Sequence, residues 1–151
     1  MKKALAILFA VLMVSTAAAE NYTVWVLCQP DSFVYVREYP KKGAKEAGYA
    51  QIGDTLTTDG TKKNGYLHVD GFEGGGWIHA GFVTENPVTV ESSEAEIVSN
   101  GRVACRRYIN GTRRKWLRNG QKLTIYARAA DWTVTNQGFI KTRFIGANSG
   151  D

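Results

Sequence analysis

The stretch GWIHAGFV at residues 76–83 decides the fold, because the chain repeats it as GFIKTRFI at residues 138–145. Each copy begins with Gly, an aromatic residue and Ile, and each ends with Phe followed by a β-branched residue. Repetition of a pattern over such a distance is typical of a duplicated structural unit. The two stretches therefore predict that the chain consists of two related units.

Three further features precede each stretch in the same order. An apolar-X-apolar-Arg segment comes first, a Gly then opens a short strand-like run, and an aromatic residue opens the next run. These features are Val34-Tyr-Val-Arg37, Gly53 and Tyr66 in the first copy, and Val103-Ala-Cys-Arg106, Gly120 and Trp132 in the second. The offset between matched positions falls from 69 at Val34 to 62 at Trp77, so the second copy has shorter loops. The pattern covers residues 33–83 and 102–145 and predicts two β modules.

The local composition also indicates strands. The segment Tyr22–Cys28 is rich in β-branched and aromatic residues, and no window beyond the first nineteen residues keeps a helical apolar period. Four Asn-Gly pairs predict tight type I′ turns, since both central positions of that turn need positive φ; they begin at Asn64, Asn100, Asn110 and Asn119. Strands are expected near residues 33–37, 54–58, 65–70 and 76–79, and near 102–106, 121–127, 132–135 and 138–140.

The first nineteen residues predict a cleaved secretory signal peptide. Lys2 and Lys3 precede an apolar run from Ala4 to Val14, and a small-residue site, Ala17-Ala-Ala19, follows it. An uncleaved anchor is the alternative, but it needs about 20 apolar residues. The mature protein is therefore expected outside the cytoplasm, in the cell wall or periplasm. The expected division is a signal peptide at 1–19, a first domain at 20–86, a linker at 87–98, a second, degenerate domain at 99–146 and a tail at 147–151.

Charge is divided unevenly between the two copies. Residues 20–90 hold six Lys/Arg and nine Asp/Glu, whereas residues 91–151 hold eleven Lys/Arg and five Asp/Glu. A basic module attracts polyanions such as cell-wall phosphates. For most of these basic side chains, however, simple solvation is the alternative. Nucleic acid is not expected as a partner, because export separates the protein from the nucleic acid of the cell.

The two cysteines leave two interpretations open. Cys28 precedes the first copy and Cys105 lies in the opening strand of the second, so a disulfide would clamp the modules together in an exported protein. Against this, strand alternation places Cys105 on the same face as Val103, where a free thiol acts as a small core residue.

These motifs resemble a known family. Val34-Tyr-Val-Arg37 is similar to the Leu/Val-Asn-Val-Arg opening of bacterial SH3 (SH3b) domains, and Gly76-Trp-Ile-His79 with Phe82-Val83 is similar to their closing Gly-Trp-Val segment. Gly53-Asp54 stands where the family usually has Lys/Glu-Gly-Thr, and the second copy has Phe139 in place of the Trp. The resemblance covers nearly the whole mature chain. It implies an all-β protein of two tandem SH3-like small barrels that bind peptidoglycan or its peptide cross-bridges, often beside a wall-cutting catalytic domain.

Two modules of about 60 residues each have marginal cores, so we expect them to pack against each other. They account for the whole mature sequence, and no catalytic domain is expected beside them. No His follows Cys105, which disfavours a papain-like site. His68 and His79, even with Asp70, lack metal-ligand spacing. The Gly-rich run 71–76 opens no helix and contains no Lys, so it is no phosphate loop. We therefore expect no enzyme activity, no cofactor and no metal.

Binding then depends on aromatic and basic side chains near the loops, since SH3-type grooves are lined by rings. The candidate ligand-binding residues are Tyr39, Tyr66, Trp77, Arg106, Arg107, Tyr108, Arg113, Arg114 and Trp132. For the largest rings a place in the core is the alternative, and we expect it for Trp77, Phe82, Trp116, Phe139 and Phe144. The favoured function is a secreted protein that binds peptidoglycan or an anionic wall polymer. An extracytoplasmic adaptor or enzyme regulator that binds a peptide or protein is the alternative.

Overall fold

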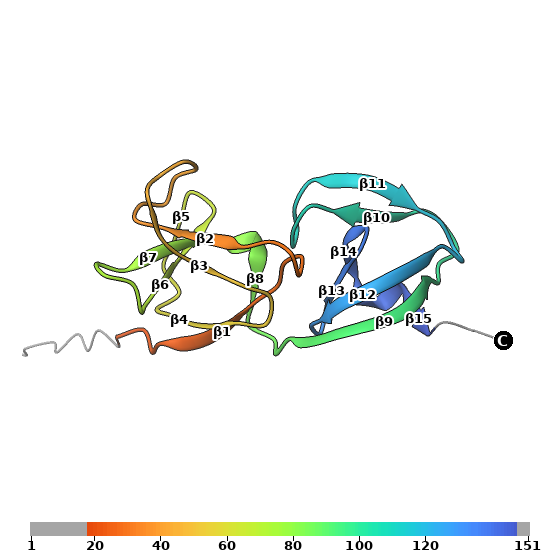
Figure 1. Cartoon of the computed structure of the whole chain (residues 1–151), viewed down its shortest axis with the longest axis horizontal. Coiled ribbons are helices and arrows are strands. Elements are labelled where there is room, and N and C mark those ends of the chain that lie inside the picture. Colours follow the sequence, from red (N-terminus) through yellow and green to blue (C-terminus); the bar gives the residue numbers. More distant parts are fainter. Residues whose placement is uncertain (1–17, 148–151) are drawn as a thin grey trace, which may run out of the picture.

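The computed structural model describes residues 18–147, and its secondary structure is β apart from two three-residue 3-10 helices. Most of the predicted signal peptide and the tail from residue 148 lie outside the described residues. Figure 1 shows β1–β8 gathered at one end of the molecule and β9–β15 at the other. Among residues 18–147, no helix is long and apolar enough to cross a lipid bilayer.

The first half consists of eight strands and one 3-10 helix. Its elements are β1 (Tyr22–Val26), β2 (Val34–Arg37), β3 (Glu46–Ala50), β4 (Thr55–Thr58), β5 (Lys62–Lys63), β6 (Tyr66–Val69), β7 (Gly76–His79), η1 (Ala80–Phe82) and β8 (Val83–Thr84). They form a three-stranded sheet in the order β4-β1-β8 and a five-stranded sheet in the order β3-β2-β7-β6-β5.

The second half forms a single seven-stranded sheet, in the order β11-β10-β14-β13-β12-β9-β15. Its elements are β9 (Thr89–Ile97), β10 (Val103–Arg106), β11 (Arg113–Leu117), β12 (Lys122–Arg128), β13 (Trp132–Thr135), β14 (Gly138–Lys141), η2 (Thr142–Phe144) and β15 (Ile145–Ala147). No described sheet contains strands from both halves.

The two halves repeat one scheme of antiparallel pairing. The ladders β1–β4, β1–β8, β2–β3, β2–β7 and β6–β7 recur as β9–β12, β9–β15, β10–β11, β10–β14 and β13–β14. Even an irregularity recurs, since the register shifts between Val36 and Arg37 and again between Cys105 and Arg106. The sequence repeat therefore corresponds to a repeat of topology.

The structure corrects several local predictions. The expected linker at 87–98 contains the nine-residue strand β9, which pairs with β12 and β15 on its two sides. Of the four Asn-Gly pairs, only Asn64-Gly65 has positive φ at both residues, and it joins β5 to β6 as a two-residue hairpin. Trp116, expected in a core, is 42% exposed on β11 between the guanidinium groups of Arg102 and Arg113.

Three groups of buried side chains hold the fold together. One lies within the first half around Val36 and Ile78, and another lies within the second half around Ile97 and Ile140. The third joins the halves: Leu27, which is 0% exposed, packs with five residues from the second half, namely Ala127, Ala129, Trp132, Val134 and Phe139. Burial of apolar surface from both halves in one cluster fixes how the halves meet.

Candidate functional site

A groove follows the junction of the two halves and consists of two adjoining hollows. The smaller, the arginine hollow, has a volume of about 280 Å³, and the larger, the aromatic hollow, about 510 Å³. The arginine hollow is lined by Cys28, Gln29, Ser32, Phe33, Val34, Phe82, Arg106, Arg107, Arg114, Gly138 and Phe139. The aromatic hollow is lined by Phe33, Tyr35, Arg37, Lys42, Tyr66, His79, Phe82, Arg107 and Tyr108.

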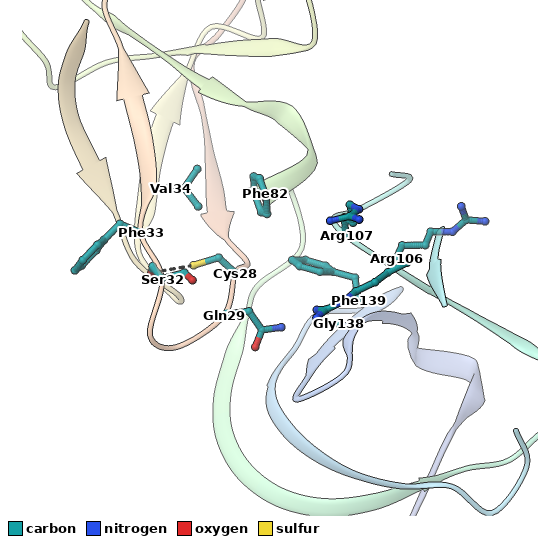
Figure 2. A pocket seen from close by; sticks show the side chains of 11 residues that line it. Cys28, Gln29, Ser32, Phe33, Val34, Phe82, Arg106, Arg107, Gly138 and Phe139 are labelled. Atoms are coloured by element: carbon teal, nitrogen blue, oxygen red, sulfur yellow. Dashed lines mark hydrogen bonds between the residues drawn. The ribbon is translucent and has the colours of Figure 1, made fainter. Parts of the chain in front are cut away.

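Both halves supply walls to the groove. Figure 2 shows Val34, Cys28 and Phe82 of the first half facing Phe139 and Arg107 of the second across the arginine hollow. Phe33, Phe82 and Arg107 line both hollows, so the two hollows adjoin. Sites where two packed units meet are common places for ligands, because each unit contributes one wall.

Phe82 stands at the centre of the groove. It lies in η1, and its carbonyl accepts a hydrogen bond from the Leu27 N–H at 2.8 Å, which ties the end of β1 to this turn. The centroid of its ring lies 5.7 Å from that of Tyr108 and 6.0 Å from that of Phe139. Rings from both halves therefore meet where the hollows join, Phe82 and Phe139 edge to face and Phe82 and Tyr108 tilted.

The Tyr108 ring packs against two glycines, Gly81 and Gly111. A Cβ at Gly81 would lie 2.3 Å from the Tyr108 ring, and one at Gly111 would lie 2.5 Å from it, so the ring fits only because both positions lack a side chain. Beside it, the Ile109 N–H donates to the Gly81 carbonyl at 2.9 Å. This hydrogen bond and the ring contact fasten the β10–β11 loop to η1 and give the groove a fixed width.

His79 forms part of the aromatic wall in its neutral form. Its Nδ1 accepts a hydrogen bond from the Gly81 N–H at 3.1 Å, and its ring lies 4.6 Å from Tyr108 and 5.6 Å from Tyr66. Burial lowers the pKa of His79, since a charged imidazole would lose hydration among these rings. The single proton of the neutral ring is therefore on Nε2, which adds one uncharged hydrogen-bond donor to this wall.

The arginines around the groove differ in what holds them. Arg106 donates from Nη1 to the Gly111 carbonyl at 2.8 Å, and its counterpart Arg37 donates in the same way to the Ala44 carbonyl at 2.7 Å. In residues 18–147, by contrast, the side chains of Arg107 and Arg114 make no hydrogen bond and lie within 4.0 Å of no carboxylate. No described Asp or Glu lines either hollow. The groove therefore presents two unpaired guanidinium groups beside a set of rings.

The cysteines are free thiols in different clusters, so the disulfide that the sequence left open does not form. Cys28 belongs to the first-half core and places its Sγ 3.8 Å from the Ser32 carbonyl, whereas Cys105 donates to the Gln137 carbonyl at 3.0 Å in the second half. Burial raises the pKa of Cys28 to about 11 and raises that of Cys105 as well. Although Cys28 lines the arginine hollow, it is a protonated, unreactive wall residue near neutral pH.

Five of the nine predicted binding residues meet at the groove, and four do not. Tyr66, Arg106, Arg107, Tyr108 and Arg114 line it. Tyr39 is 67% exposed on the β2–β3 loop, and Trp132 is 5% exposed within the cluster that joins the halves. Trp77 stacks edge-on against His68 at 5.1 Å, and Arg113 lies over the Trp116 ring at 4.5 Å; both lie outside the two hollows.

Several lining residues were not selected from the sequence. Phe33 and Tyr35 are 52% and 44% exposed at alternate positions along the start of β2, and this alternation was a usable signal. His79 and Phe82 belong to the repeated stretch at residues 76–83, but nothing in the sequence shows that the second half packs beside them. Gln29 donates to the Thr135 carbonyl at 2.9 Å across the junction, a contact that only the fold reveals.

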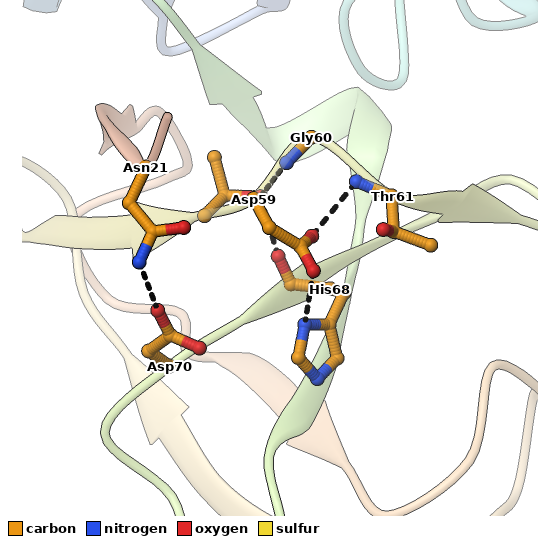
Figure 3. Close-up of polar contacts among 7 residues, drawn as sticks. Asn21, Asp59, Gly60, Thr61, His68 and Asp70 are labelled. Atoms are coloured by element: carbon orange, nitrogen blue, oxygen red, sulfur yellow. Dashed lines mark hydrogen bonds and ion pairs between the residues drawn. The ribbon is translucent and has the colours of Figure 1, made fainter. Parts of the chain in front are cut away.

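His68 belongs to a separate polar cluster, which Figure 3 shows. Its Nδ1 lies 3.5 Å from Asp59 Oδ2, and Asp59 accepts from the Thr61 N–H at 2.9 Å. That backbone hydrogen bond is the main reason why the pKa of Asp59 is lowered. Asp70 points elsewhere, to Asn21 Nδ2 at 3.3 Å. Within the described part of the chain, no three His, Cys, Asp or Glu side chains gather as metal ligands.

No family model and no curated protein matches the chain. Solved structures similar to it include two proteins from one organism. NlpC1 from Trichomonas vaginalis is 14% identical, with a TM-score of 0.38 and coverage of 94% of this chain and 51% of that one. NlpC2 from Trichomonas vaginalis is 11% identical, with a TM-score of 0.38 and coverage of 88% and 51%. The chain thus spans about half the length of these two proteins.

Proposed function

We propose that this chain is an extracytoplasmic, non-catalytic binding protein made of two SH3b-like barrels, which holds bacterial cell-wall material in the groove between them. The ligand is peptidoglycan or an anionic wall polymer. The observation that carries the proposal is the lining of the groove by the described residues: rings from both halves, four arginines and no carboxylate. Rings bind flat apolar surfaces of sugars and peptides with little loss of entropy, and guanidinium groups bind anions.

The chemistry of the groove supports binding rather than catalysis. The thiol in its wall has a pKa of about 11, and His79 has no carboxylate partner among the described residues. A nucleophile needs an adjacent base or a lowered pKa, and neither Cys28 nor His79 is placed to supply one.

Sedimentation with purified sacculi tests the proposal. The mature chain should sediment with sacculi at low ionic strength and be released partly by salt, because guanidinium contacts are screened. Ser32→Trp should reduce the bound fraction several-fold, since this exposed residue lines the arginine hollow and a Trp would fill it. Ser92→Trp, on the exposed face of β9 outside the two hollows, is the matched control and should bind normally. Absence of sedimentation at low salt, or a cleared zone on a wall-containing zymogram, would contradict the proposal.

A second candidate is an adaptor that binds an extended peptide or protein segment. It is favoured by the edge strand β3, which borders the exposed rings of Phe33, Tyr35 and Tyr49. The equivalent edge strand β11 begins with three basic residues, whereas β3 carries a single charge, Glu46. Charged residues protect sheet edges from pairing, so β3 is the less protected edge. Crosslinking in the native host that recovers one dominant protein, without binding to sacculi, would favour this function.

A further inference from the structure

The two hollows of the groove have different chemistry, which limits the kind of ligand that fits both. The arginine hollow combines Arg107 and Arg114 with the polar side chains of Gln29 and Ser32. The aromatic hollow is lined mainly by rings, and its cations are Arg37 and Lys42 of the first half and Arg107, which it shares with the arginine hollow. A ligand that spans the groove therefore meets the unpaired guanidinium groups of Arg107 and Arg114 at one end and a wall richer in rings at the other.

The internal repeat shows which arginines are available to a ligand. Arg37 and Arg106 occupy equivalent positions after equivalent register shifts, and each binds a carbonyl of the loop that follows it. This shared contact identifies both as structural residues that close their loops. The side chains of Arg107 and Arg114 bind no loop carbonyl in the described structure.

Charge reversal between the copies reinforces this distinction. In the first copy, Glu38 pairs with Lys45 at 2.8 Å, and Glu46 lies opposite Arg37 with 4.0 Å between their charged groups. In the second copy, Arg107 stands at the position of Glu38, and Arg113 stands opposite Arg106 at the position of Glu46. The second copy has thus replaced both carboxylates by cations, and its loop lacks an internal counter-charge.

We propose that Arg107 and Arg114 bind a carboxylate of a wall peptide, while the sugar or amide part of the same fragment lies on the rings of the aromatic hollow. This inference rests on the proposed function and names its ligand class. Guanidinium groups pair with carboxylates through short, charge-assisted hydrogen bonds. A phosphate would satisfy the same two arginines, but a polymer with a charge on every unit would also place anions against the ring-rich wall of the aromatic hollow. The divided lining therefore favours a ligand with one charged end.

Calorimetry with the mature chain tests the ligand class. The probes are soluble disaccharide-peptides released from peptidoglycan by a muramidase, the same fragments with their carboxylates amidated, and poly(glycerol phosphate). The native fragments should bind, and amidation should weaken binding about 10-fold, the usual effect of losing one charge-assisted hydrogen bond. Equal affinity for native and amidated fragments, or tighter binding of poly(glycerol phosphate), would overturn the inference.

Variants connect the effect to the two residues. Arg107→Gln and Arg114→Gln should each weaken binding of the native fragments about 10-fold and leave binding of the amidated fragments unchanged. Arg118→Gln makes the same charge change at an exposed position outside both hollows and should change affinity less than about 2-fold. A loss in Arg118→Gln equal to that in Arg107→Gln would show a general charge effect and refute the subsite.

The outcomes separate the inference from the function on which it rests. If the wild-type chain and the Arg107→Gln variant sediment equally with sacculi, the wall function stands and the carboxylate subsite is wrong. The opposite case is a correct carboxylate subsite in a protein that does not bind the wall. It is tested with an N-acetylated dipeptide that has a free carboxylate, by measuring the NMR chemical shifts of the arginine Nε–H signals. Shifts at Arg107 and Arg114 with the acid but not with its amide, without sacculus binding, would keep the subsite and remove the wall function.

Discussion

Replacing Gly81 by Ala should destabilise the junction between the halves, because the new methyl group would collide with Tyr108. The added Cβ would lie 2.3 Å from the Tyr108 ring and 3.0 Å from the His79 ring. Carbon atoms in contact normally stand about 3.5–4.0 Å apart, so the Tyr108 ring has to move by more than about 1 Å. Gly81 does not have positive φ, so its backbone accepts Ala, and the collision alone determines the effect.

The magnitude follows from what the displaced ring loses. Overpacking of a buried site costs about 1–3 kcal/mol. Movement of Tyr108 also weakens its ring contacts with His79 and Phe82, each worth about 0.5–1.5 kcal/mol. Allowing for partial relaxation of the loop, we expect the free energy of unfolding to fall by about 2 kcal/mol. At about 4 °C per kcal/mol, the Tm should fall by roughly 8 °C.

Urea and thermal unfolding, followed by tryptophan fluorescence and circular dichroism, measure this loss. Gly101→Ala is the matched control, since a Cβ there meets nothing within 4 Å and its φ is not positive. The control should keep its stability or gain up to about 1 kcal/mol from reduced chain entropy. A double-mutant cycle identifies the cause: in a Tyr108→Ala background, Gly81→Ala should cost less than about 0.5 kcal/mol. An equal loss in both backgrounds would refute the proposed collision.

Three further predictions concern the junction and its buried groups. Leu27→Ala should lower the free energy of unfolding by about 2–5 kcal/mol in urea titrations, because Leu27 is 0% exposed in the cluster that joins the halves; a loss below 1 kcal/mol would contradict that role. Cys28, with its pKa of about 11, should react with a disulfide reagent only as the protein unfolds, and rapid reaction of the native protein would refute its burial. Because the pKa of His79 is lowered in the fold, the unfolded state binds the extra proton: stability should be full above about pH 6.5 and fall toward pH 5, and His79→Gln should reduce that slope.

The repeat made most of the strands predictable, because matched apolar positions locate the same ladders in both copies. Strands β3 and β11 were not predicted, since each lies at the edge of its sheet and EAGYA and RRKWL show little alternation. Strand β9 was taken for a linker because most of its residues are polar, and only Ala95 and Ile97 are buried. An edge or half-exposed strand needs few apolar residues, so hydrophobic pattern alone misses it.

The candidate site was less predictable, because it exists only where the two halves meet. The sequence identified Arg107, Tyr108 and Arg114 as loop residues with binding chemistry, and the structure places them at the groove. It also selected Trp132, which is instead buried in the cluster with Leu27. The packing of one module against the other decides which rings face solvent, and a pattern within a single module does not contain that information.

The seat of Tyr108 also limits how many modules can be joined in this way. Tyr39 is the counterpart of Tyr108 in the first copy and remains 67% exposed. The matching seat in the second copy would be at the position of Gly81, but Arg143 stands there. A head-to-tail contact that could repeat would build an open filament of chains. The arginine side chain occupies that position, so the second half does not repeat the glycine contact that receives Tyr108.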